Sequence, residues 1–297
     1  MYLVIMRKVV GVLMAVVVFG IVSCSKSMSQ YNEEIDRAEK LMQSSVDSAL
    51  SVLDAIEPSE LKIDSLRAKY HFLKGYAHLA GNRSMIGDSL VRYAYDYYRG
   101  KDIVRDIRSS IVFAWYKFWS GDTPGSLAML DSLSGLTRVP DSIMVQTLRV
   151  RALLGASEYQ GRQLIPFAKK LYELETDSIR KVEARSMLLA AYEYAGETDS
   201  ALFIADELID YARNNNWGDK QFLFELERAQ LLAENGRNAD SDELVGEIFR
   251  KAGYDNGAAD LLYFQYAINA LNSGDVGRAS RNLVLADSVA GKLRSED

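Results

Sequence analysis

The side chains best suited to chemistry are few in this sequence. One cysteine and two histidines occur among its 297 residues, so neither a cysteine-ligated zinc site nor a histidine-rich metal centre can be assembled. His71 and His78 are seven residues apart, which puts them on one face of a helix but about 10 Å apart along its axis. No carboxylate lies between them to complete a ligand set. We therefore expect no metal ion and no cofactor.

Catalytic motifs are also missing. The sequence contains no G-x-x-x-x-G-K-[S/T] phosphate loop, no G-x-G-x-x-G dinucleotide loop, no H-E-x-x-H zinc helix and no G-x-S-x-G nucleophile turn. Its 41 acidic residues are explained by helix caps and solvated helix faces. A pair of acids placed as in glycosidases remains an alternative. The expectation is a protein that is not an enzyme.

The cysteine has a distinctive setting near the N-terminus. Arg7 and Lys8 precede an uncharged apolar run from Val9 to Val22. This run is shorter than the roughly 20 residues of a membrane-spanning helix and is typical of a secretory signal. The run ends in Ile21-Val22-Ser23-Cys24, which resembles the lipobox of bacterial lipoproteins. An ordinary signal peptide with a chance cysteine and a true transmembrane anchor are the alternatives.

The lipobox resemblance implies a signal peptide over residues 1–23 and acylation of Cys24, with palmitate among the acyl chains. Two or three acyl chains, at about 0.8 kcal/mol per buried methylene, anchor a protein almost irreversibly. Ser25 stands where an aspartate would signal retention in the inner membrane, which favours the outer membrane of a Gram-negative cell envelope. Residues 24–30 are expected to form a short lipidated tether.

The rest of the chain is acidic. Removal of residues 1–23 takes away Arg7 and Lys8 and no acid, so 33 basic residues (35 − 2) face 41 acidic ones. The resulting net charge of about −8 suits a soluble body held away from an anionic membrane. A pI near 5.2 for the whole chain argues against nucleic acid as a partner.

Two residue types recur regularly through the body of the chain, in two series that we call the glycine ladder and the aspartate ladder. Glycines recur every 35 to 40 residues, at Gly81, Gly121, Gly161, Gly196, Gly236 and Gly274. Aspartates precede them by 17 to 20 residues, at Asp64, Asp102, Asp141, Asp177, Asp219 and Asp255. An aspartate can cap the start of a helix, and a glycine can adopt the positive φ at which a helix ends. Each interval therefore predicts one helix of about four turns.

A second helix is predicted after each of these turns. Residues 47–56, 125–133 and 199–208 share a pattern in which a small residue is followed by apolar residues at helical spacing. The small residues are Ala49, Ser126, Ala201, Ser241 and Ala279, and the position four residues later holds Leu53, Leu130, Ala205, Val245 and Leu283. Small side chains at such positions let neighbouring helices approach closely.

This organisation resembles a tetratricopeptide-repeat (TPR) array, in which two antiparallel helices, A and B, form each unit. The resemblance covers roughly residues 30–293 and implies an all-α, right-handed superhelical solenoid of about seven helix pairs. The average period near 38–40 residues exceeds the roughly 34 of the family, so the repeats are divergent. We expect one elongated domain over residues 31–297, stabilised by stacking of neighbouring pairs.

In TPR arrays helix A faces the concave surface, so the resemblance also suggests where a partner would bind. Counting back from the turn glycines places eleven residues there: His71, His78, Trp115, Phe118, Trp119, Arg151, Glu158, Tyr159, Glu193, Tyr194 and Gln230. Trp and Tyr bury a large area at low entropic cost, and Arg can hold a carboxylate, which suits a peptide groove. Burial of the Trp and Phe side chains in the core is the alternative.

The sequence predicts a membrane-anchored scaffold that binds a peptide segment or a helix of a partner protein in the concave groove. The alternative is a cell-surface lipoprotein that binds a glycan or another nutrient. Such a site would need two or three exposed aromatic rings on one open face, with Asp, Asn or Arg nearby. The exposure of Trp115, Trp119 and Tyr159 tests both readings, because burial of all three would weaken each of them.

Overall fold

The computed structural model describes residues 26–85, 90–252 and 258–296. These residues form fourteen α-helices, α2 to α15, with one 3-10 turn, and contain no β-strand. Cys24, Asp255 and the expected signal peptide over residues 1–23 lie outside them. Within the described part of the chain, no helix is both long and apolar enough to cross a membrane.

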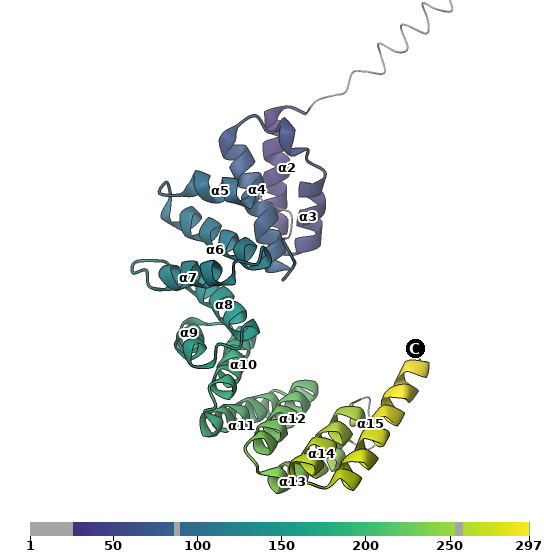
Figure 1. Cartoon of the computed structure of the whole chain (residues 1–297). Coiled ribbons are helices and arrows are strands. Elements are labelled where there is room, and N and C mark those ends of the chain that lie inside the picture. Colours follow the sequence, from purple (N-terminus) through teal and green to yellow (C-terminus); the bar gives the residue numbers. More distant parts are fainter. Residues whose placement is uncertain (1–25, 86–89, 253–257, 297) are drawn as a thin grey trace, which may run out of the picture. The chain divides into compact units, whose positions relative to one another are not determined.

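The helices follow one another as seven antiparallel pairs (Figure 1). The A helices are α2 (Met28–Leu41), α4 (Asp64–Ala80), α6 (Ile103–Trp119), α8 (Asp141–Ser157), α10 (Ser178–Tyr194), α12 (Gly218–Glu234) and α14 (Ala259–Asn272). The B helices are α3 (Val46–Asp54), α5 (Val91–Tyr98), α7 (Thr123–Ser134), α9 (Gly161–Leu174), α11 (Thr198–Asn214), α13 (Asn238–Ala252) and α15 (Val276–Glu296). The prediction of an all-α chain of seven helix pairs is confirmed.

The helices belong to two compact units, of which one ends at Ser126 and the other begins at Leu127. The boundary therefore lies inside α7 and not in a linker. In the first unit α4 contacts α2, α3, α5 and α6, and in the second α10 contacts α8, α9 and α11. Within each unit a pair thus packs on the pairs next to it in sequence, which is how a solenoid is stabilised.

The small residues of the B helices mark the closest contacts within the pairs. Ala49, Ser126, Ala201, Ser241 and Ala279 are all at most 1% exposed. Two of them also hydrogen-bond across the pair: Ser126 Oγ donates to the carbonyl of Ala114, and Ser241 Oγ donates to that of Ala229, each over 2.7 Å. A larger side chain would push the B helix away from its A helix. The role predicted for these positions is confirmed.

The glycine ladder marks the turns in four of its six units. Gly121, Gly196, Gly236 and Gly274 have φ between 70° and 87°, which is where glycine is favoured. In the other two units a neighbouring residue adopts the positive φ instead. Asn82 does so after Gly81, with φ of 49°, and Tyr159 does so before Gly161, with φ of 53°.

The aspartates of the aspartate ladder mark helix starts as predicted, but only some of them are N-caps. The side chains of Asp102 and Asp177 cap α6 and α10 by accepting from the backbone N–H three residues later. Asp64, Asp141 and Asp219 lie inside the first turn of their helices instead. A carboxylate there still faces the positive end of the helix dipole, so the N-cap prediction is wrong for these three while the helix starts are right.

The last three residues of the segment predicted as a tether, residues 24–30, belong to α2. Ser27 caps α2 by accepting from the backbone N–H of Gln30, whose side chain in turn accepts from the N–H of Ser27. This capping box starts the helix at Met28, so residues 28–30 are helical.

Gly161 has a packing role that its place in the ladder did not reveal. It is the first residue of α9 and lies against the C-terminal end of α10. A Cβ added there would lie 2.3 Å from both the carbonyl carbon of Tyr194 and the nitrogen of Ala195. Both atoms belong to the backbone and cannot rotate away, so only glycine fits.

Replacing Gly161 by alanine should therefore destabilise the protein by about 1–3 kcal/mol through overpacking. At Gly196 an added Cβ meets nothing within 4 Å, so Gly196→Ala should cost about 1–2 kcal/mol from its positive φ alone. The urea concentrations at the unfolding midpoints of the wild type and the two variants measure the two losses of stability. A larger loss for Gly196→Ala would contradict the close contact between α9 and α10.

Candidate functional site

Three of the residues predicted to line the groove are core residues. His71, Trp115 and Arg151 are at most 3% exposed. Trp115 Nε1 donates to the carbonyl of Arg83 over 3.1 Å, while the guanidinium of Arg151 pairs with Asp131 and lies 4.4 Å from the ring centre of Phe167. The groove prediction is wrong for these residues, because their side chains face the neighbouring helices and not solvent.

Three further residues in the first unit are half-buried. His78 Nδ1 lies 3.0 Å from the carbonyl oxygen of Ser84. The rings of Phe118 and Trp119 contact each other and Trp115, with centroids 5.7 to 6.1 Å apart. These aromatic residues pack mainly on one another, as the core alternative expected. Among the residues that the structure describes, no group of three or more His, Cys, Asp or Glu could hold a metal ion.

Apart from Arg151, the predicted groove residues of the second unit remain accessible. Glu158 and Gln230 are exposed and Glu193 is half-buried. Tyr159, held at positive φ just after α8, is 72% exposed, and Tyr194, at the end of α10, is 40% exposed. Their rings meet edge to face with centroids 5.0 Å apart. The structure thus gathers solvent-accessible aromatic rings at the ends of two A helices.

Two glutamates of α12 extend this region and were missed by the sequence analysis. Glu227 and Glu234 lie on either side of Gln230 at spacings of three and four, so all three share one face of the helix. Together with Tyr159, Glu193 and Tyr194 they form what we call the carboxylate–tyrosine surface. Their spacing was visible in the sequence, but their proximity to α10 was not.

Burial and electrostatic repulsion both act on the ionisable groups of the carboxylate–tyrosine surface. Burial, with repulsion from Glu193, raises the pKa of Glu227 to about 7. Burial also raises the pKa of Glu193, and Glu234 raises it further. The pKa of the Tyr194 hydroxyl is raised by burial and then by Glu193, Tyr159 and Glu227. In each of these three groups the surroundings disfavour the ionised form.

No cation of the protein offsets this repulsion within the described residues. The ion pairs found there include none to Glu193, Glu227 or Glu234. By contrast, Glu225 on the same helix pairs with Lys251, and Asp206 of α11 pairs with Arg228. Among the described residues, the carboxylates of this surface thus differ from Glu225 and Asp206 in having no paired cation.

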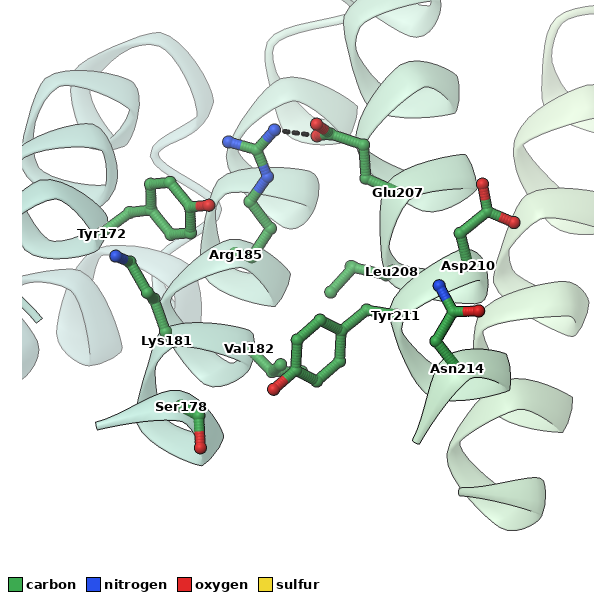
Figure 2. Close-up of a pocket in the computed structure, with 10 residues that line it drawn as sticks. All are labelled: Tyr172, Ser178, Lys181, Val182, Arg185, Glu207, Leu208, Asp210, Tyr211 and Asn214. Carbon is green, nitrogen blue, oxygen red and sulfur yellow. Dashed lines mark hydrogen bonds and ion pairs between the residues drawn. The ribbon is translucent and has the colours of Figure 1, made fainter. Parts of the chain in front are cut away.

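A hollow of about 410 Å³ lies elsewhere in the second unit, between the end of α9, α10 and α11. Figure 2 shows the rings of Tyr172 and Tyr211 on opposite sides of it, with Arg185 paired to Glu207 at its upper edge. Lys181 Nζ and the guanidinium carbon of Arg185 lie 5.2 and 4.7 Å from the centre of the Tyr172 ring. The cations of this hollow are thus engaged by the protein itself.

Comparison with known proteins supports the fold. No protein-family model matches the sequence, and no curated protein matches it. A solved structure of nearly identical TPR-like repeats from Podosopora anserina, described as those of a kinesin light chain, matches with a TM-score of 0.51 and 12% identity. That match covers 65% of this chain and 98% of the other.

A point variant of the same repeats gives a TM-score of 0.53 at 12% identity, over 65% of this chain and 99% of the other. This chain folds as a TPR-like α-solenoid. At this identity the likeness shows the fold alone. The carboxylate–tyrosine surface, which belongs to helices α8, α10 and α12 of the TPR-like solenoid, has to be interpreted from its own chemistry.

The raised pKa of Glu227 predicts how stability depends on pH. The folded state holds this proton up to about pH 7, whereas the ordinary value is 4.5. The protonated carboxyl therefore contributes stability below about pH 4.5, and that contribution is lost as the pH rises through 7. Glu227→Gln should stabilise the protein by about 1–2 kcal/mol at alkaline pH, after allowance for partial exposure, and should have no effect at acidic pH.

Chemical unfolding at several pH values measures this difference. Glu243→Gln on α13 is the matched control, because Glu243 is exposed and should give the same small difference at every pH. If Glu227→Gln stabilises the protein equally at acidic pH, the ionised carboxylate of Glu227 is not what destabilises the folded state.

Proposed function

We propose that the protein is a lipid-anchored interaction scaffold whose carboxylate–tyrosine surface binds a basic segment of a partner protein. The observation that carries this proposal is the proximity of Glu193 and Glu227. The two carboxylates repel each other, and neither forms an ion pair with a cation among the described residues. No reaction is part of the proposal.

A basic segment would complement this surface in two ways. A lysine or arginine placed between Glu193 and Glu227 would relieve their repulsion and favour ionisation of both. An arginine would also find the rings of Tyr159 and Tyr194 exposed beside these carboxylates, where cation–π contact contributes about 0.5–1 kcal/mol at an exposed site. Leu223, which is exposed one turn before Glu227, adds apolar area for a neighbouring residue of the segment.

The rings on which the predicted glycan site depended are mostly covered. Trp115 is buried and Trp119 is half-buried, so of the three rings that distinguish the two functions only Tyr159 is open to a ligand. In the hollow of Figure 2, Lys181 and Arg185 already lie against the ring of Tyr172, and this ring is not free for a sugar to stack on.

The membrane attachment in this proposal rests on the N-terminal sequence. Acylation of Cys24 would place the protein on a membrane of the cell envelope, in the outer membrane by the argument from Ser25. Three residues separate Cys24 from Met28, where α2 begins, and they span about 10 Å when extended. The first unit would then lie close to the bilayer, and a partner held in the same membrane would be locally concentrated.

Binding of a basic peptide should be selective and should depend on pH. The probe is a synthetic peptide with alternating Lys, Arg and Leu, compared with the same peptide carrying Glu in place of Lys and Arg. We expect the full chain to bind the basic peptide alone, and to bind it more tightly above pH 7 than below, because Glu227 must lose its proton. Calorimetry in buffers of different ionisation enthalpy should detect the released proton.

Variants of the surface identify the groups responsible. Glu193→Gln combined with Glu227→Gln should weaken binding of the basic peptide by about tenfold or more, and Glu243→Gln on α13 should leave it unchanged. Equal binding of both peptides, or unchanged affinity in the double variant, would contradict the proposed surface.

The anchor has its own test in intact cells. The wild-type chain and Ser25→Ala should incorporate labelled palmitate and sediment with the membrane fraction, whereas Cys24→Ser should do neither. Incorporation of the label by Cys24→Ser would contradict acylation at Cys24. It would not bear on the proposed peptide-binding surface.

A further inference from the structure

A hollow of about 490 Å³ in the first unit is lined by the first turn of α2 and by residues of α4, α5 and α6. Its lining includes three apolar side chains, two cations and one tyrosine ring, which are Met28, Ile63, Leu66, Lys69, Arg105 and Tyr98. Such a mixture complements an amphipathic ligand that carries an anionic group.

A smaller hollow, of about 60 Å³, adjoins the first, since both are lined by Lys69, Tyr98 and Arg105. Its lining adds Arg108, which lies one turn after Arg105 on α6 and shares its face. Lys69 already pairs with Glu39, which also lines this hollow, and with one further carboxylate of α2. The two arginines are therefore the cations on which an added anion would depend.

Arg105 and Arg108 have no carboxylate partner within the described part of the chain. Both are exposed, and the ion pairs found there include none to either of them. Asp102 and Asp106 lie close by in sequence, but their carboxylates accept hydrogen bonds from the backbone N–H groups of Arg105 and Gly100, each over 2.8 Å. Two unpaired guanidinium groups on one helix face suit a phosphate, whose oxygens arginine can bind through parallel hydrogen bonds.

The charge of the chain is divided unevenly between its two units. Residues 24–126 contain 14 basic and 14 acidic residues, whereas residues 127–297 contain 19 basic and 27 acidic residues. The first unit is thus neutral, and the net charge of about −8 belongs to the second unit. An anionic membrane surface would repel the second unit but not the first.

We propose that the hollow at the start of α2, together with Arg105 and Arg108, binds the phosphate and the adjoining apolar part of an anionic phospholipid. This inference rests on the lipid anchor proposed above. Three residues separate Cys24 from Met28, and Met28 lines the hollow, so acylation of Cys24 would hold the site at a surface where phospholipids are concentrated. A bound lipid would then fix the orientation of the first unit on the membrane. The carboxylate–tyrosine surface of the second unit takes no part in this contact.

Native mass spectrometry of the full chain in a neutral detergent, at a series of lipid concentrations, tests the site. We expect the chain to retain one molecule of phosphatidylglycerol and to release phosphatidylcholine, whose head group has no net charge. Arg105→Glu should raise the dissociation constant for phosphatidylglycerol by about tenfold or more. Arg162→Glu in the second unit makes the same change of charge at an exposed arginine of α9 and should leave the constant unchanged. Both variants should keep the wild-type circular dichroism and melting temperature, because both side chains are exposed.

Competition separates a lipid from other anions. Excess inorganic phosphate should not displace phosphatidylglycerol, and neither should a peptide of alternating Glu and Leu. Displacement by phosphate would indicate a site for a soluble phosphate, and displacement by the peptide would indicate a protein ligand, so either result would overturn the proposal. Equal retention of phosphatidylcholine, or equal weakening by Arg162→Glu, would overturn it as well.

The lipid site and the lipid anchor can fail separately. In detergent, Cys24→Ser should retain phosphatidylglycerol as the wild type does, because the hollow does not include Cys24. Loss of palmitate labelling at Cys24 with normal binding of phosphatidylglycerol supports both proposals. Normal labelling of a wild-type chain that binds no phosphatidylglycerol would overturn the lipid site alone.

Discussion

Close approach of the two helices in each pair is the constraint on which the rest of this structure depends. In several pairs the B helix carries a fully buried alanine or serine near its start, as at Ala49, Ser126 and Ala201, which lets it approach its A helix closely. Once that approach is made, the pair presents a combined face that the next pair covers. The interior is therefore a series of local clusters, such as those formed by α2–α4, by α8–α10 and by α12–α15.

Local features of this kind could be predicted from the sequence, and features created by packing between pairs could not. Helix starts and turns depend on a few adjacent residues, so the ladders found the helix pairs even where the positive φ had moved from Gly81 to Asn82. The ladder could not show that Gly161 is required for contact with the backbone of Tyr194. That requirement arises between two helices of different pairs, although the residue type was visible.

The candidate site illustrates the same limit. Counting from the turns placed His71 and Trp115 correctly on A helices, but neighbouring helices cover their side chains, and burial of this kind has no local signal. Positions near the helix ends, such as Tyr159 and Tyr194, remained accessible as expected. The repulsion between Glu193 and Glu227 acts between residues 34 positions apart, and only the folded structure brings them together.

The location of that repulsion follows from how a solenoid distributes its stability. The carboxylates lie on α10 and α12, above a cluster of fourteen buried apolar residues between α9 and α12, compared with seven in each of the clusters on either side. Burial of one leucine or isoleucine contributes about 1.5–3 kcal/mol relative to exposure, so a single such residue offsets the strain at Glu227. Because stability is shared only with neighbouring pairs, that local cluster has to provide the compensation. The fourteen buried residues between α9 and α12 therefore exceed what is needed to offset the burial of this carboxylate.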